Sequence, residues 1–137
     1  MKRLSILVVA LAIFAIHARG QDAALIAHPS VGDTKVSAED VKGILLGTKT
    51  KWDAGGVIKL IVLSEGVVHE KVIKDYTQRT GDQFDKHWKK QVFTGKGIMP
   101  QVAKTDAEVV DYVAKTPGAF GYVARENATD SVKLLTP

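Results

Sequence analysis

The sequence predicts an α/β fold of three layers, in which a mixed, mostly parallel sheet lies between helices on both of its faces. The predicted elements follow the order β-α-β-α-α-α-β-β, and such alternation is typical of a sheet covered by helices. Residues Val57–Leu63 (VIKLIVL) are nearly all apolar and rich in branched side chains. A run of this kind is typical of a central strand that is buried on both faces. No repeat or linker follows Gln21, so we predict one domain over residues 21–137.

Residues 1–20 have the order of segments found in a secretory signal peptide. Lys2 and Arg3 supply positive charge, Ile6–Ile16 is an apolar run too short for a stable anchor, and small residues at positions 18 and 20 precede a cleavage site before Gln21. A buried N-terminal helix or a short membrane anchor is the alternative interpretation. We expect cleavage, export to a bacterial periplasm and a mature domain without a membrane anchor.

Composition limits the classes of partner. Removal of residues 1–20 leaves 16 basic residues against 15 acidic ones, and this balance does not favour a nucleic acid partner. The sequence has no cysteine, so the core has to stabilise the domain without disulfides, and no cysteine is present for a lipid anchor.

The first predicted strand and the first predicted helix are short. Ala24–His28 (ALIAH) predicts a strand, which Pro29 ends. Ser37 and Asp40 form a weak capping pair at the start of a helix that Gly47 ends. The apolar residues of this helix have helical spacing: Val41, Ile44 and Leu45.

Two further helices are predicted over residues 67–78 and 82–93. Their apolar side chains lie four positions apart, at Val68, Val72 and Tyr76 in one helix and at Phe84, Trp88 and Val92 in the other. Aromatic stripes of this kind are more typical of core packing than of cofactor contacts.

The last predicted helix begins with a capping box. Thr105 and Glu108 have the spacing of such a box, and the helix runs to about Lys115. Its predicted inner face consists of Ala107, Val110 and Ala114, with Val113 beside it. Strands predicted over residues 120–124 and 132–135 complete the sheet.

The sequence shows no catalytic or metal-binding pattern. It lacks a cysteine nucleophile and a Gly-x-Ser-x-Gly turn, and His28, His69 and His87 do not have the spacing of metal ligands. We therefore expect a protein that acts by binding, without a cofactor or a metal, rather than an enzyme.

Two turns have the properties of an anion-binding site. Ser64 and Gly66 lie between the apolar strand and the next helix, where ligands of open α/β sheets bind and a helix N-terminus offers free N–H groups. Glu65 counts against an anion there, and a helix cap is the alternative role of Ser64. The glycine turn of residues 94–97 (TGKG) offers Lys96, although a plain helix-ending loop has the same composition.

Basic residues also cluster around both tryptophans. Lys49 and Lys51 precede Trp52, and lysines at positions 86, 89 and 90 surround Trp88. They form either a patch for an acidic partner or the solvated rim of two buried rings.

Three segments of the chain resemble the substrate-binding proteins of phosphate ABC importers. Residues 41–52 (VKGILLGTKTKW), followed by VIKLIVL, resemble the helix, glycine turn, tryptophan and strand of that family. Residues 84–100 (FDKHWKKQVFTGKGIMP) and 116–123 (TPGAFGYV) resemble sequence motifs of its small members, and the second motif is the most specific. The resemblance covers nearly all of the predicted domain. It implies a single lobe of the type II periplasmic binding protein fold, in which full-length members clamp the ligand between two lobes.

The phosphate-binding residues of the family do not carry over one by one. Full-length members have a Ser-Gly-Thr-Arg motif at the start of the helix after the apolar strand, where this sequence has Val67, Val68, His69 and Glu70. The candidate oxyanion site that remains consists of Ser64, Gly66, a protonated His69 and Lys96.

Two functions stay open. The resemblance implies an exported solute-binding protein for phosphate or another small anion, with an ABC permease as partner. On this hypothesis a homodimer of two copies completes the cage. The alternative is a periplasmic protein-interaction or accessory module that has kept the lobe and lost phosphate binding. We expect this site to hold phosphate with a Kd no lower than about 1 mM, and to bind it better below about pH 6.5 if His69 contributes.

Overall fold

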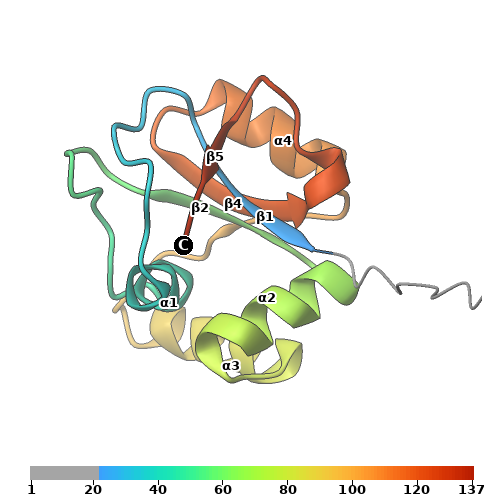
Figure 1. Cartoon of the computed structure of the whole chain (residues 1–137). Helices are drawn as coiled ribbons and strands as arrows, with labels where there is room; N and C mark the ends of the chain where they lie inside the picture. The colour runs from blue at the N-terminus through green and yellow to red at the C-terminus, as the bar shows by residue number, and fades with distance from the viewer. Residues whose placement is uncertain (1–21) are drawn as a thin grey trace, which may run out of the picture.

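The computed structural model describes residues 22–137. They contain a five-stranded sheet with the strand order β3-β2-β4-β1-β5 (Figure 1). The strands are β1 (Ala23–Ala27), β2 (Lys59–Leu63), β3 (Gln101–Ala103), β4 (Ala119–Ala124) and β5 (Lys133–Leu135). The predicted signal peptide and its cleavage site lie outside the described residues.

Four of the five strands run in one direction. β2 pairs in parallel with β3 and with β4, whereas β1 pairs antiparallel with β4 and with β5. The predicted mixed, mostly parallel sheet is therefore confirmed, with β1 as the strand of opposite direction.

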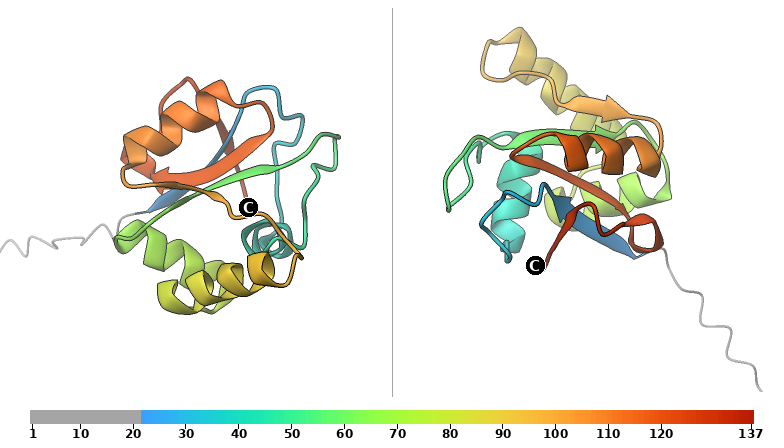
Figure 2. Two further views of the ribbon diagram at one scale, coloured as in Figure 1. Left: turned by 180° about the vertical axis from the view of Figure 1, so that it is seen from behind. Right: turned by 90° about the horizontal axis from the view of Figure 1, so that it is seen from above.

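Helices cover both faces of the sheet (Figures 1 and 2). α4 (Asp106–Lys115) packs on one face against β4 and β2, and α2 (Val67–Thr77) packs on the other against β4 and β1. α1 (Ala38–Leu46) and α3 (Gly81–Phe93) lie beside α2, and a short 3-10 helix, η1 (Arg125–Asn127), follows β4. The predicted three-layer α/β lobe is confirmed. None of the helices in residues 22–137 has the length and apolar character that crossing a membrane requires.

Side-chain caps fix where the helices begin. The Ser37 hydroxyl accepts a hydrogen bond from the Asp40 N–H at 3.0 Å, as the sequence predicts. The Thr105 hydroxyl accepts one from the Glu108 N–H at 3.2 Å, but the Glu108 carboxylate accepts from the Lys104 N–H at 2.9 Å. The predicted capping box is therefore half formed, with the carboxylate reaching one residue further back.

One strand is absent from the sequence predictions, and two predicted positions are wrong. β3 was not predicted, because it is a three-residue edge strand with only Ala103 buried and thus has no apolar pattern. Val92, predicted on the buried face of α3, is 44% exposed, since the last turn of that helix extends past the elements that bury Trp88. Val57, predicted in the buried strand, is exposed because β2 begins two residues later.

The buried face of α4 also differs from the prediction. Val109, Val110 and Val113 are buried, whereas Ala107 is exposed and Ala114 is half-buried. α4 lies so close to β4 that a Cβ atom on Gly121 would come within 2.9 Å of the Val109 side chain. The valines therefore fill the space above Gly121, which has no side chain, and the two alanines lie at the solvent-facing edges of the helix.

Candidate functional site

The carboxyl ends of β2, β3 and β4 meet at one edge of the sheet, which is where open α/β sheets bind ligands. A depression of about 220 Å³ lies there, and we call it the carboxyl-end cleft. Its lining comes from the ends of these strands, from the starts of α2 and α4, and from η1. Among the lining residues are Gly66, one lysine, Lys104, and three acidic residues, Glu65, Asp106 and Glu126.

The charge balance of the carboxyl-end cleft disfavours an anion. Three carboxylates oppose one ammonium group, so an anionic ligand meets net electrostatic repulsion at short range. Asp106 is held in place, because its Oδ2 accepts hydrogen bonds from the Ala124 N–H at 3.0 Å and from Asn127 Nδ2 at 2.8 Å. This carboxylate therefore joins α4 to the end of β4.

Ser64 and Gly66 both lie at this edge, between the end of β2 and the start of α2. Gly66 is the N-cap of α2, with a φ of 112° and no side-chain cap, so the alternative role of Ser64 as the cap is wrong. Ser64 is exposed, and its N–H donates to the Ala103 carbonyl at 2.9 Å, which continues the pairing of β2 with β3. The donors that this edge offers an anion thus include the first-turn N–H groups of α2, the exposed Ser64 hydroxyl and Lys104.

His69 lies in the core, where it is 2% exposed, and not in the cleft. The Tyr122 hydroxyl accepts a hydrogen bond from the Leu63 N–H at 3.2 Å, and its oxygen lies 2.7 Å from His69 Nδ1. The hydroxyl proton is therefore free to donate to Nδ1, an arrangement in which Nδ1 is the acceptor and the ring is neutral. Burial lowers the pKa of His69, although the carboxylates of Glu70 and Asp85 oppose this effect. The fold therefore disfavours the protonated His69 of the sequence hypothesis.

Glu70 and Lys96 are also placed away from an anion site. The Glu70 carboxylate accepts a hydrogen bond from the Gly81 N–H at 3.0 Å, so it stabilises the start of α3. Lys96 lies in the turn after α3 and lines a different hollow from the one that Gly66 lines. The structure therefore does not bring Ser64, Gly66, His69 and Lys96 together into one site.

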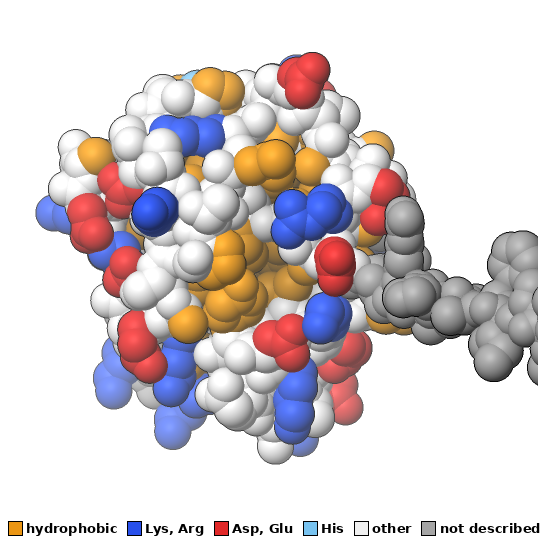
Figure 3. Space-filling model, in the orientation of Figure 1, with side chains coloured by type: hydrophobic (Ala, Val, Ile, Leu, Met, Phe, Trp, Pro, Cys, Tyr) orange, Lys and Arg blue, Asp and Glu red, His pale blue; other side chains and the backbone are white. Residues whose placement is uncertain are grey.

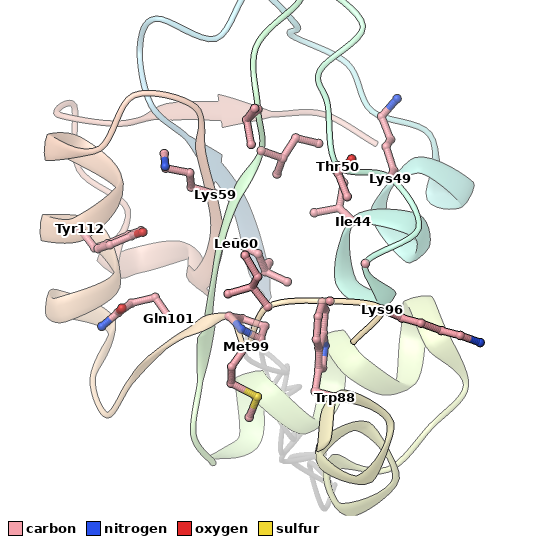
Figure 4. Close-up of a pocket in the computed structure, with 16 residues that line it drawn as sticks. Ile44, Lys49, Thr50, Lys59, Leu60, Trp88, Lys96, Met99, Gln101 and Tyr112 are labelled. Atoms are coloured by element: carbon pink, nitrogen blue, oxygen red, sulfur yellow. The ribbon is translucent and has the colours of Figure 1, made fainter. Parts of the chain in front are cut away.

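The hollow beside Lys96 is larger, about 520 Å³, and lies at the amino-terminal end of β2 (Figure 4). We call it the apolar groove. Residues 57–60 and 96–101 form two of its walls, and Ile44, Trp88 and Tyr112 lie among its other lining residues. The sequence hypotheses missed Ile98 and Met99. The signal for them was present as an apolar pair between a glycine turn and Pro100, outside any helical or strand periodicity.

Both tryptophans are buried and have structural hydrogen bonds. Trp88 Nε1 donates to the Leu45 carbonyl at 3.0 Å, and His87 Nε2 lies 2.8 Å from the Leu46 carbonyl. These carbonyls belong to the last turn of α1, where a helix leaves its acceptors without intrahelical partners. Trp52 Nε1 donates to the Gly118 carbonyl at 3.0 Å. The three segments that carry the family resemblance are thus joined to one another by the tryptophans.

No protein-family model and no curated protein sequence matches this chain. Several solved structures do match its fold. An ABC-type phosphate transport receptor from Vibrio cholerae aligns with a TM-score of 0.55 and 15% identity over 82% of this chain. PstS from Borrelia burgdorferi aligns with a TM-score of 0.60 and 19% identity over 83% of the chain. A protein described as a phosphate ABC transporter substrate-binding protein, solved with bound phosphate, from Clostridium perfringens, gives a TM-score of 0.65 and 17% identity over 82%.

The chain has the fold of the phosphate ABC transporter substrate-binding proteins. It spans less than half of their length, since it covers 44%, 46% and 43% of the three chains, respectively. Two of these solved structures are described as a transport receptor and a substrate-binding protein. Within residues 22–137, no cluster of three or more His, Asp or Glu side chains could hold a metal ion. At these levels of identity only the fold is shared, and the chemistry of the site has to be argued from this chain.

Proposed function

We propose that the chain is a non-enzymatic accessory module of the periplasm, which acts by binding another protein and not as a phosphate receptor on its own. In this proposal residues 1–20 are a cleaved signal peptide and residues 21–137 are the mature domain. The observation that carries the proposal is the charge of the carboxyl-end cleft, where three carboxylates oppose one ammonium group.

The other candidate contacts do not compensate for this charge. A tight oxyanion site surrounds its ligand with charge-assisted hydrogen bonds and excludes water. Here His69 is buried against Tyr122, Glu70 binds the start of α3, and Lys96 lines the apolar groove. The first-turn N–H groups of α2, the Ser64 hydroxyl and Lys104 remain, beside open solvent on a single lobe. We therefore expect a Kd for phosphate no lower than about 1 mM, or about 4 kcal/mol of binding free energy.

Isothermal titration calorimetry of residues 21–137 with phosphate at pH 7 tests this proposal. Glu65→Gln combined with Glu126→Gln should strengthen the weak binding, because it removes two negative charges from the cleft lining and leaves the structural Asp106 in place. Glu39→Gln, an exposed acidic residue in the first turn of α1, is the matched control and should change nothing. Micromolar binding by the unmodified monomer would refute the proposal and restore the transport role.

A second candidate function is solute binding by two paired copies with an ABC permease as partner. It is favoured by the fold that this chain shares with solved proteins described as phosphate receptors or binding proteins, of which it covers 43–46%. Analytical ultracentrifugation with and without 10 mM phosphate, on the order of ten times the expected Kd, distinguishes the two functions. A dimer that forms only with phosphate supports the second function, and a monomer in both conditions supports the accessory module.

A further inference from the structure

The apolar groove leaves large apolar side chains in contact with solvent. Ile98 is 90% exposed, Val57 is 58% exposed and Met99 is 45% exposed, and all three line the groove. In Figure 4 the Met99 and Leu60 side chains lie near the middle of the groove, and the Trp88 ring stands along one side. Apolar side chains gathered in a hollow are typical of a surface that another molecule covers.

The charged residues of the groove are all lysines. Lys49, Lys59 and Lys96 line it, and no acidic residue does. Lys49 is paired with Asp53 at 2.6 Å and Asp40 at 3.8 Å, but Lys59 and Lys96 have no carboxylate within 4.0 Å among residues 22–137. On the face shown in Figure 3, by contrast, basic and acidic side chains are interspersed. The groove therefore combines apolar surface with uncompensated positive charge.

The groove wall beside Trp88 is held by a hydrogen bond and by close packing. Trp88 Nε1 donates to the Leu45 carbonyl at 3.0 Å, and the edge of the indole lies against the backbone of Gly47 and Gly97. Both glycines line the groove together with the ring. A surface that is fixed before binding loses little conformational entropy when a partner is added.

We propose that the apolar groove binds a segment of a partner protein in which apolar side chains are flanked by Asp or Glu. This inference rests on the proposed function as a protein-binding module and assigns the partner's chemistry. The apolar residues of the segment cover Val57, Ile98 and Met99, and its carboxylates pair with Lys59 and Lys96. A second copy of this chain and an anionic membrane surface are the rival occupants.

Fluorescence anisotropy with a labelled peptide tests the proposal. The probe has the sequence DELIVLED, and two control peptides replace either all four acidic residues with Lys or the four central apolar residues with Ser. The expected Kd of the probe is on the order of 100 µM at low salt, and each control should bind at least about tenfold more weakly. Equal binding of the Lys peptide, or no binding of the probe up to about 1 mM, would overturn the proposal.

Matched variants locate the binding surface. Met99→Glu should weaken probe binding at least about tenfold. Leu134→Glu is the control, because Leu134 is 52% exposed and lies in β5, the opposite edge strand of the sheet. Lys59→Gln with Lys96→Gln should reduce affinity severalfold and weaken its salt dependence, whereas Lys74→Gln on α2 should not. Far-ultraviolet circular dichroism checks that each variant is folded.

Two further results would assign the groove to a rival occupant and refute the proposal. One is a concentration-dependent dimer that Met99→Glu abolishes, and the other is Met99-dependent binding to vesicles of phosphatidylglycerol. These outcomes are independent of the phosphate titration, which tests the carboxyl-end cleft. The groove proposal can therefore fail while the loss of phosphate binding stands.

Discussion

Gly47 allows a test of how closely α1 and α3 pack. It ends α1 in the left-handed conformation, with a φ of 81°. A Cβ atom built on it would lie 2.6 Å from Cη2 of Trp88, far inside ordinary van der Waals contact. The substitution Gly47→Ala therefore has two separate effects, one on the backbone and one on the packing of the indole.

The two effects can be estimated separately. A left-handed conformation costs an L-residue about 1–2 kcal/mol, and overpacking of a filled site costs about 1–3 kcal/mol. Gly47→Ala should thus lower the free energy of unfolding by about 2–5 kcal/mol. Gly95 is the matched control, since it also follows a helix, has a φ of 71°, and has no atom within 4 Å of a built Cβ. Gly95→Ala should cost only the backbone contribution of about 1–2 kcal/mol.

Urea unfolding followed by far-ultraviolet circular dichroism measures both variants. A double-mutant cycle with Trp88→Phe, which removes the outer ring that a Cβ would meet, should reduce the cost of Gly47→Ala to that of Gly95→Ala. If Gly47→Ala and Gly95→Ala destabilise the unmodified chain equally, Trp88 does not pack against the end of α1 and the reasoning is wrong.

Three more predictions follow from the buried residues and the N-terminal segment. Trp88→Ala should lower the free energy of unfolding by about 3–5 kcal/mol in the same assay, and a loss below about 1 kcal/mol would contradict the packing described. Because burial lowers the pKa of His69 from 6.5, the unfolded chain takes up a proton that the folded chain resists. Stability should therefore be full above about pH 6.5 and fall at lower pH by up to about 1.4 kcal/mol per unit, a slope that His69→Gln should reduce in urea titrations at several pH values. Mass spectrometry of protein from a periplasmic fraction should find an N-terminus within a residue or two of Gln21, and retention of residues 1–20 there would contradict export.

Most helices and strands could be predicted because their signals are local. Ser37 and Thr105 cap helices that begin at the next residue, and the spacing of Phe84 and Trp88 correctly identified buried positions of α3. The buried face of α4 could not be chosen in this way. Ala107 and Ala114 have helical spacing as good as that of Val109 and Val113, and the contact with Gly121 in a later strand decides that the two valines are buried.

The site could be predicted only in part, because it depends on partners that are distant in the sequence. The position of Gly66 at the start of a helix follows from the local pattern of strand, turn and helix. The role of His69 does not, because its hydrogen-bond partner Tyr122 is 53 residues away. The same holds for Lys96, since only the folded chain shows that its turn lies beside Trp88 and the start of β2.

The position of β1 has a consequence for when the chain can fold. β1 lies inside the sheet, and its two neighbours are β4 and β5, so Ala27 pairs with Phe120 and with Lys133. A polypeptide made and threaded from its N-terminus therefore has no partner for its first strand until nearly the last residues arrive. Contacts of such long sequence separation form late, because the loop between them has to close first. Under the export proposed above, the complete sheet can form only when the C-terminal strand has crossed the membrane.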